Sequence, residues 1–337
     1  MKHIAGVDIG GTKISVTIAS KVGIKINLIQ PTKLIGSNET IPKQADKLIE
    51  YACEQIRIKK NSIASVGVST TSPFLKKGKY KVDIAPNLCG GLLKNSNIPN
   101  KWKYIPIEKS LLKKYKRVEI QNDGVAAVVA VKTFSTRKEE NNLVYVTWST
   151  GIGSGAIVDN RIITGKNGNA PHLGHIYIAE KGPQCRCGNR GDMESLCSGI
   201  SIARDYGKNT ETKDVFRNYN KDPKAKKIID RAARNFARGL ASMTTIVDND
   251  LYVLGGSVFM NNKKILFPII KDEFYKAFSI LTKEVKFEPS DLDKYFGDIA
   301  ALSLVMPEKW KKRWNKEKPW KNAPKPIVLD PDGNVER

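Results

Sequence analysis

Residues 3–20 read HIAGVDIGGTKISVTIAS, which is an apolar run, a pair of glycines and a second apolar run. The pattern predicts a strand, a tight turn and a second strand. The same order returns in NLVYVTWSTGIGSGAIVDNRIITG at residues 142–165. This repetition predicts that the chain has two related halves, each opening with two strands joined by a glycine turn.

The segments around these two stretches alternate between strand and helix patterns. GIKINLIQPTKL (23–34) predicts a third strand and therefore a β-meander, and IASVGVST (63–70) predicts a buried strand. Apolar residues at helical spacing predict helices over residues 43–56 and about 223–247, and the second of these leads into the strand and turn LYVLGGSV (251–258). The sequence therefore predicts an α/β fold.

Length and composition place the chain among soluble globular proteins. Its 337 residues are 40% hydrophobic, which favours two domains over one. No apolar run approaches the ~18 residues of a membrane helix, and the first residues lack the pattern of a secretory signal. Five cysteines are an odd number and suggest no disulfide framework. We expect a cytoplasmic protein whose cysteines are core thiols, such as Cys53, or metal ligands.

The formal net charge of +23 raises the question of nucleic-acid binding. The lysines are spread along the whole chain, and no zinc-finger helix or RNA-binding aromatic signature accompanies them. We therefore expect a generally basic surface and no nucleic-acid partner. Its field would still attract anionic nucleotides.

Three glycine turns suit the binding of phosphate, because glycine lets backbone N–H groups approach an anion closely. They are DIGGTK (8–13), STGIGSG (149–155) and LGGS (254–257). One such turn alone is more often a simple hairpin. Three in this order favour a site that holds the phosphates of ATP and lets its nucleoside lie against backbone.

The segment NAPHLGHIYIAEKGPQCRCGNRGDMES (169–195) contains two of the three histidines and two of the five cysteines. His175, Cys185 and Cys187 offer the imidazole and thiolate ligands that zinc prefers. A metal site alone leaves His172 and Glu194 without an explanation.

Taken together, these motifs resemble the ROK family of sugar kinases and sugar-responsive repressors, within the actin and hexokinase superfamily. The resemblance covers about residues 4–305 and includes QNDGVAA (121–127). It implies two ribonuclease-H-like α/β domains hinged around a cleft. The expected N-terminal domain spans 1–121 and is completed by about 298–306, the expected C-terminal domain spans 122–297, and residues 307–337 form a basic extension.

The resemblance also implies transfer of the ATP γ-phosphoryl group to a sugar hydroxyl, with Mg²⁺ as cofactor. Asp123 matches the general base, although an Asn-Asp-Gly at this place also fits a helix cap. The sugar-binding residues implied are Asn87, Gly91, Asn122, Asp123, His172, His175 and Glu194. Those on the ATP side are Asp8, Gly10, Gly11, Thr12, Lys13, Thr150, Gly151, Gly255 and Gly256, with Asp8 orienting Mg²⁺ through water.

The family's zinc pattern is His, nine residues, then Cys-x-Cys-Gly-x-x-Gly-Cys-x-Glu. Here Asp192 stands at the third cysteine, and a carboxylate is a harder and weaker zinc ligand than a thiolate. Cys197 is an alternative fourth ligand. Zinc would be structural and would aim His175 and Glu194 at the sugar. The other interpretation is a metal-free loop with two thiols.

The residue at position 172 bears on substrate choice. Glucokinases of the family have Glu-x-Gly-His here, whereas bacterial N-acetylmannosamine kinases have His as in this chain. APNLCGGLL (85–93) also resembles the sugar loop of the latter. We favour N-acetylmannosamine, with a broad-specificity hexokinase or glucokinase as the alternative. A repressor without kinase activity is disfavoured because the first phosphate loop begins at Asp8, which leaves no room for a DNA-binding domain. The resemblance also suggests a homodimer.

The extension after Met306 is rich in tryptophan, lysine and proline. Trp310 and Trp314 are four residues apart and would share one helix face, and the prolines from Pro319 onward predict an extended path. We expect a strap that packs its indoles on this chain or on a dimer partner. The alternative is an element that binds nucleic acid or a membrane surface.

Overall fold

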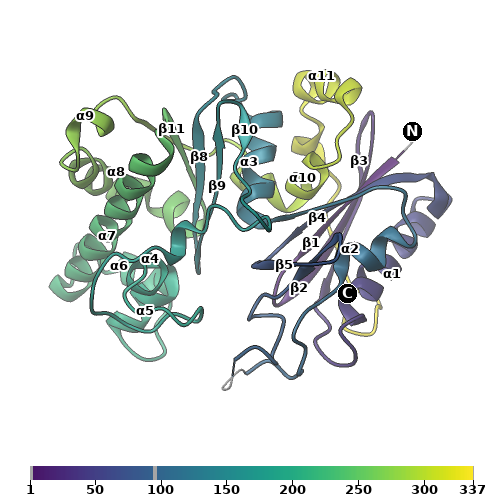
Figure 1. Cartoon of the computed structure of the whole chain (residues 1–337), viewed down its shortest axis with the longest axis horizontal. Coiled ribbons are helices and arrows are strands. Elements are labelled where there is room, and N and C mark those ends of the chain that lie inside the picture. Colours follow the sequence, from purple (N-terminus) through teal and green to yellow (C-terminus); the bar gives the residue numbers. More distant parts are fainter. Residues whose placement is uncertain (1–2, 94–96, 337) are drawn as a thin grey trace. The chain divides into compact units, whose positions relative to one another are not determined.

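The computed structural model describes residues 3–93 and 97–336 and shows a mixed α/β chain (Figure 1). Residues 1, 2 and 337, at the ends of the expected domains, lie outside the described residues. The chain divides into two compact units. Unit 1 contains the chain as far as Lys138, Thr164–Asn169, and the segment from Lys294 onward. Unit 2 contains Glu139–Ile163 and Ala170–Asp293.

Unit 1 is built on a six-stranded sheet of order β13-β3-β2-β1-β4-β7. Strands β1, β2 and β3 form an antiparallel meander, which confirms the three strands predicted over residues 3–34. β4 and β7 continue the sheet in parallel with β1. The bounds are His3–Ile9 (β1), Lys13–Ser20 (β2), Gly23–Pro31 (β3), Ile63–Thr70 (β4), Val118–Asn122 (β7) and Ile327–Val328 (β13).

Helices cover both faces of this sheet, since β2 is buried at every position after Lys13. α1 (Thr40–Gln55) and α10 (Phe296–Ser303) both contact β2. Gly67 in β4 allows the close approach of α10, because a Cβ there would lie 1.9 Å from the backbone oxygen of Ala301. Three smaller elements complete this part: the hairpin of β5 (Phe74–Lys77) and β6 (Tyr80–Asp83), the helix α2 (Ile107–Leu112), and the helix α3 (Asp123–Phe134).

Unit 2 repeats the opening of unit 1 in a five-stranded sheet of order β10-β9-β8-β11-β12. β8 and β9 are antiparallel and joined by the second glycine turn, and β11 pairs with β8 in parallel, as β4 pairs with β1. The two related halves predicted from the repeated motif are therefore confirmed. The bounds are Leu143–Trp148 (β8), Ile152–Val158 (β9), Arg161–Ile162 (β10), Leu251–Gly255 (β11) and Lys286–Pro289 (β12).

The helices of unit 2 enclose a core of their own. The predicted long helix is α7, Pro223–Val247, and Phe236 on its buried face stacks on Trp148 with ring centroids 4.1 Å apart. The other helices are α4 (Met193–Cys197), α5 (Gly199–Tyr206), α6 (Thr212–Arg217), α8 (Ser257–Phe274) and α9 (Ser279–Thr282). Among the described residues, no helix combines the length and the apolar character needed to cross a membrane.

The C-terminal extension packs on unit 1 as a strap. Its helix α11 (Glu308–Glu317) buries Trp310 and Trp314, and the following 3-10 turn buries Trp320, so all three indoles are at most 1% exposed. Trp314 and Trp320 pack on Phe134 at the end of α3. β13 then adds a parallel strand to the edge of β3. The structure confirms docking against this chain, although Pro319 begins a 3-10 turn before the extended segment.

The two units differ from the expected domains in three segments, residues 122–138, 164–169 and 294–297, which belong to unit 1. The sequence places α3 at the start of the second domain, after residue 121, whereas its contacts group it with unit 1. For α3 the physical reason is packing, because α3 contacts both α10 and α11 (Figure 1).

Candidate active site

The first glycine turn joins β1 to β2 in unit 1. Gly10 N donates to Lys13 O at 2.9 Å, and Thr32 Oγ1 donates to Gly10 O at 2.8 Å. The side chains of Thr12 and Lys13 are exposed beside it. A turn with glycine backbone, a hydroxyl and an ammonium group is chemically suited to phosphate oxygens.

Asp8 lies next to the last residue of β1. Burial raises the pKa of Asp8 to about 6, although a hydrogen bond from Ser69 lowers it; the negative charge of Asp123 raises it further and Lys13 lowers it. Asp8 and Asp123 are therefore close enough to repel each other. A cation between or beside such carboxylates would relieve this repulsion.

Asn122 and Asp123 form the junction between β7 and α3. Asn122 is the N-cap of the helix, and its Oδ1 accepts from Gly124 N at 2.9 Å. Its Nδ2 donates to Ser72 Oγ at 2.8 Å, which holds the amide from the other side. Asp123, the first residue of α3, is exposed, and its Oδ1 also accepts from Gly124 N, at 2.8 Å. The helix cap is thus Asn122, and Asp123, the expected general base, is the residue next to it.

The loop after β6 places Asn87 against the first glycine turn. A Cβ on Gly11 would lie 3.3 Å from Asn87 Nδ2, and Thr71 Oγ1 donates to Asn87 Oδ1 at 3.2 Å. Packing explains why residue 91 is glycine, because a Cβ there would lie 2.4 Å from Lys101 O. The structure thus brings Asn87 to the phosphate turn and packs Gly91 under a neighbouring backbone segment.

Asp83 is a buried carboxyl group that the sequence analysis missed. It is 0% exposed; Ala85 N donates to its Oδ1 at 2.7 Å, and Thr70 Oγ1 donates to its Oδ2 at 2.8 Å. Burial raises the pKa of Asp83 to about 7, opposed by these two hydrogen bonds and reinforced by the charge of Asp123. The sequence feature that could have identified Asp83 is its position as an acidic residue in the otherwise apolar stretch VDIAP (82–86).

In unit 2, the second and third glycine turns are tied together by Ser149. Its Oγ accepts from Ser257 N at 2.9 Å at the start of α8, and its backbone oxygen accepts from Gly199 N at 2.9 Å. Thr150 beside it is exposed. Gly256 has φ +88°, and a Cβ there would lie 2.5 Å from Trp148 O, so no other residue fits this turn. Gly255 is the paired last residue of β11.

Glu194 also contacts the second turn. Its Oε2 accepts from Ile152 N at 2.8 Å, and a Cβ on Gly151 would lie 2.6 Å from the same oxygen. Its other oxygen lies 3.8 Å from Cys185 Sγ. The carboxylate expected to bind sugar therefore also links the phosphate turn to the cysteine segment.

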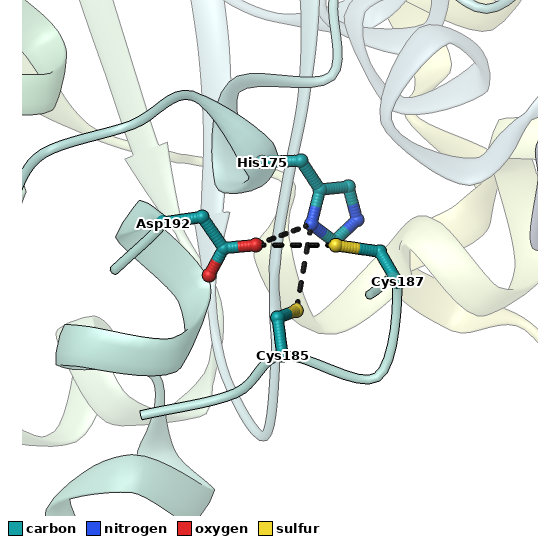
Figure 2. A group of neighbouring side chains, drawn as sticks. All are labelled: His175, Cys185, Cys187 and Asp192. Atoms are coloured by element: carbon teal, nitrogen blue, oxygen red, sulfur yellow. Dashed lines mark hydrogen bonds and ion pairs between the residues drawn. The ribbon is translucent and has the colours of Figure 1, made fainter. Parts of the chain in front are cut away.

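Four residues of unit 2 direct potential metal ligands at one point: His175, Cys185, Cys187 and Asp192. Their ligand atoms all lie within 4.8 Å of one another, and Figure 2 shows the imidazole, both sulfurs and one carboxylate oxygen facing inward. His175 Nδ1 and Cys187 Sγ lie 3.2 Å and 3.3 Å from Asp192 Oδ2. One imidazole, two thiols and one carboxylate form a donor set that fits tetrahedral zinc.

Asp192 has two functions in this cluster. Its Oδ1 accepts from Ser195 N at 2.8 Å and so caps α4, which leaves Oδ2 for the cluster. Although burial alone would raise the pKa of Asp192, hydrogen bonds from His175 and from Ser195 hold it well below its usual value. Cys197, the alternative ligand, is not brought in: its Sγ is buried and donates to Met193 O at 2.9 Å.

His172 is half-buried and precedes the 3-10 turn Leu173–His175. Its ring centroid lies 5.7 Å from that of His175. Burial lowers the pKa of His172, and the neighbouring His175 lowers it further. Both effects favour the neutral imidazole.

The predicted site residues thus form two groups, which we describe separately. Unit 1 holds Asp8, Asn87, Asn122 and Asp123 around the first glycine turn. Unit 2 holds the second and third turns, Glu194, His172 and the metal-ligand cluster.

The chain is similar to several sugar kinases. The glucokinase of Aeropyrum pernix is 27% identical over 321 residues, covering 88% of this chain and 93% of its own. The N-acetylmannosamine kinase of Vibrio cholerae serotype O1 is 30% identical over 257 residues, covering 75% of this chain and 83% of its own. The crystal structure of the ROK hexokinase from Thermus thermophilus matches with a TM-score of 0.71 and 26% identity, covering 89% of this chain and 98% of that one.

The fold is the one that such kinases share, with two domains of the actin and hexokinase type. The sequence matches the ROK family over residues 4–305, which is most of its length. The chain therefore belongs to the ROK family.

Proposed function

We propose that the chain is an ATP-dependent sugar kinase that phosphorylates the 6-hydroxyl of a hexose or N-acetylhexosamine, with N-acetylmannosamine as the preferred substrate. One observation carries this proposal. Asp123 is exposed at the first turn of α3, and the adjacent Asn122 is held on both sides by hydrogen bonds. This is the arrangement of a positioned base with access to a substrate.

In this reaction the Asp123 carboxylate accepts the proton of the sugar hydroxyl. The hydroxyl oxygen forms a bond to the γ-phosphorus of ATP as the bond from that phosphorus to the β,γ-bridging oxygen breaks, and ADP leaves. The proton remains on Asp123 until it is released to solvent. Thr12, Lys13 and the glycine backbone of the first turn contact phosphate oxygens.

Mg²⁺, when bound with ATP, neutralises charge on the phosphates. Asp8 is the residue that would orient its water shell. Burial raises the pKa of Asp8, and a nearby cation would favour its charged form. Zinc would be held by His175, Cys185, Cys187 and Asp192, where it would stabilise the loop that carries Glu194.

His172 supports the choice of N-acetylmannosamine. A neutral imidazole has one acceptor nitrogen, whereas a carboxylate accepts from two hydroxyls at once. The N-acetylmannosamine kinase of Vibrio cholerae, at 30% identity, is in keeping with this choice. The second candidate is a glucokinase or broad-specificity hexokinase, which the relatives from Aeropyrum pernix and Thermus thermophilus favour.

The test is an ADP-release assay with glucose, mannose, fructose, N-acetylglucosamine and N-acetylmannosamine. We expect the highest kcat/KM with N-acetylmannosamine. Glucose in first place would favour the second candidate, and no release with any of these sugars would contradict kinase activity.

Asp123→Asn tests the base. We expect turnover to fall about 10²- to 10⁴-fold while ATP and sugar still bind, because the amide cannot accept the proton. Asp222→Asn is the matched control, since Asp222 caps α7 through Lys224 N and asparagine caps equally well. Near-normal turnover in Asp123→Asn would show that the base is another residue.

A further inference from the structure

Four consecutive residues with hydroxyl side chains end β4 and begin the segment after it: Ser69, Thr70, Thr71 and Ser72. Ser69 and Thr70 are at most 2% exposed. A buried hydroxyl without a hydrogen bond is destabilising, so apolar residues would be favoured here if packing alone decided. Each of the four hydroxyls contacts a different residue of unit 1.

Two of the contacts reach residues expected to bind phosphate and sugar. Ser69 hydrogen-bonds the carboxylate of Asp8. Thr71 Oγ1 donates to Asn87 Oδ1 at 3.2 Å, which fixes which end of the Asn87 amide faces the first glycine turn. Asn87 therefore has its carbonyl held and its Nδ2 toward Gly11.

The other two contacts hold the start of the sugar loop and the catalytic turn. Thr70 Oγ1 donates to Asp83 Oδ2 at 2.8 Å, where the loop that carries Asn87 leaves β6. Ser72 Oγ accepts from Asn122 Nδ2 at 2.8 Å, one residue before Asp123. Removal of either hydroxyl would leave a buried polar group without this partner.

The position of β4 in the sheet explains why one short run reaches all these segments. β4 lies between β1 and β7 and is parallel to both, with Ser69 opposite Asp8 and Thr70 opposite Asn122. The carboxyl ends of parallel strands meet at one edge of a sheet. Residues that continue past the end of the middle strand can therefore contact both neighbours.

We propose that residues 69–72 form a positioning strip, which holds Asp8, the loop with Asn87 and the Asn122–Asp123 turn in the geometry that phosphoryl transfer requires. The inference rests on the proposed kinase function and deepens it. Thr71 acts through Asn87 on sugar binding, and Ser72 acts through Asn122 on the chemical step. Small displacements of positioning groups reduce rates by as much as about 10²-fold.

The hydroxyls of Thr71 and Ser72 should give separable kinetic effects. Thr71→Val keeps the shape but not the donor, and it should raise the KM for sugar about 3- to 10-fold with little change in kcat, the effect of one lost hydrogen bond. Ser72→Ala should lower kcat by about 10-fold or more with little change in the KM for sugar. Thr71→Ser and Ser72→Thr, which restore the hydroxyls, should recover most of each loss.

Ser65→Ala is the matched control, because Ser65 is a buried serine of the same strand whose Oγ has no hydrogen-bond partner among the described residues. Its kinetic constants should stay at wild-type values. The proposal is overturned if Thr71→Val and Ser72→Ala behave like Ser65→Ala, or if the hydroxyl-restoring variants are as impaired as the variants that lack the hydroxyl.

A failure of the kinase function can be told apart from a failure of this inference. If the wild-type chain phosphorylates none of the five sugars, amide hydrogen exchange of residues 83–91 and 121–127 replaces the kinetic readout. Faster exchange of 83–91 in Thr71→Val and of 121–127 in Ser72→Ala would support the positioning strip. Unchanged exchange in both segments would overturn it.

Discussion

Three carboxyl groups of unit 1 show how environment gives one residue type different states. Asp123 is exposed, whereas burial raises the pKa of Asp8 to about 6 and that of Asp83 to about 7. The charge of Asp123 raises both values further. Asp83, which is fully buried, is therefore the carboxyl group most able to keep a proton near neutral pH, and Asp123 remains the one available to accept a proton from a substrate.

Asp83 makes stability depend on pH in a defined direction. Its pKa rises from an ordinary 3.8 to about 7 on folding, so the folded chain binds this proton more tightly. The stabilising contribution is complete below pH 3.8 and is lost as the pH rises through 7. Asp83→Asn resembles the protonated form and can keep the hydrogen bond from Ala85 N.

We therefore expect Asp83→Asn to gain stability over the wild-type chain by roughly 1.4 kcal/mol per pH unit between pH 5 and 7. Melting temperatures of both proteins at pH 5, 6, 7 and 8 measure this gain. A difference that stays constant with pH would show that Asp83 keeps the same charge throughout.

Position 172 is where a single side chain should change substrate ranking. His172→Glu restores a carboxylate that can accept from two sugar hydroxyls. We expect kcat/KM for glucose to rise relative to N-acetylmannosamine by about 10-fold, the effect of about 1.4 kcal/mol. The five-sugar ADP-release assay measures the ranking, and an unchanged order would mean that His172 only packs.

At the scale of elements, the cysteine segment is held by short-range pairing rather than by regular strands. Isolated bridges join Tyr177 to Asp192 and Gln184 to Arg190, which fold the segment back on itself. Gly191 makes this possible, because it has φ +69° and a Cβ there would lie 2.2 Å from Ala179 O. The cluster thus lies in a loop without regular strands, which a bound metal would stabilise further.

Metal analysis of the purified chain should find about one zinc per chain. Asp192→Cys should retain zinc against a chelator for longer than the wild-type chain, because thiolate is the better zinc ligand. Cys185→Ala should lose the metal, whereas Cys197→Ala should keep it because Cys197 Sγ donates to Met193 O away from the cluster. If zinc-free protein melts at the same temperature as zinc-loaded protein, the interpretation as a metal-free loop is favoured.

At the scale of the whole molecule, each unit has its own hydrophobic core, and the C-terminal strap belongs entirely to unit 1. The strap ties parts of unit 1 that are distant in sequence. Trp314 Nε1 donates to Ser20 O at 3.1 Å, and Asn315 Nδ2 donates to Thr133 O at 2.9 Å, at the end of the helix that begins with Asp123. Its lysines, such as Lys312 and Lys316, remain exposed.

Deletion of residues 307–337 should lower the melting temperature without changing which sugar is preferred. Trp314→Ala should reproduce much of this loss, since truncation of a buried tryptophan costs about 3–5 kcal/mol. Lys312→Ala, on the exposed side of the same helix, is the control and should melt like the wild-type chain. Equal stability of the truncated protein, with loss of binding to nucleic acid or anionic lipid, would contradict the strap.

The elements that could be predicted from the sequence are those whose signal is local and periodic. The β-meander, the long helix α7, the repeated strand–glycine turn–strand units and the family motifs all follow from residues close together in the chain. The burial of the strap's tryptophans was predictable for the same reason, since Trp310 and Trp314 share a helix face.

Contacts between residues distant in the sequence could be found only from the folded chain. In the sequence, Asp83 is one acidic residue among apolar residues. In the fold, it lies against Thr70 and near Asp123. Whether Asp192 or Cys197 is the fourth potential metal ligand depends on the direction of the first turn of α4, which cannot be predicted from residue spacing. The partners of residues 69–72 come from three other segments of unit 1. Such contacts depend on the packing of the whole unit, so no periodic pattern in the sequence predicts them.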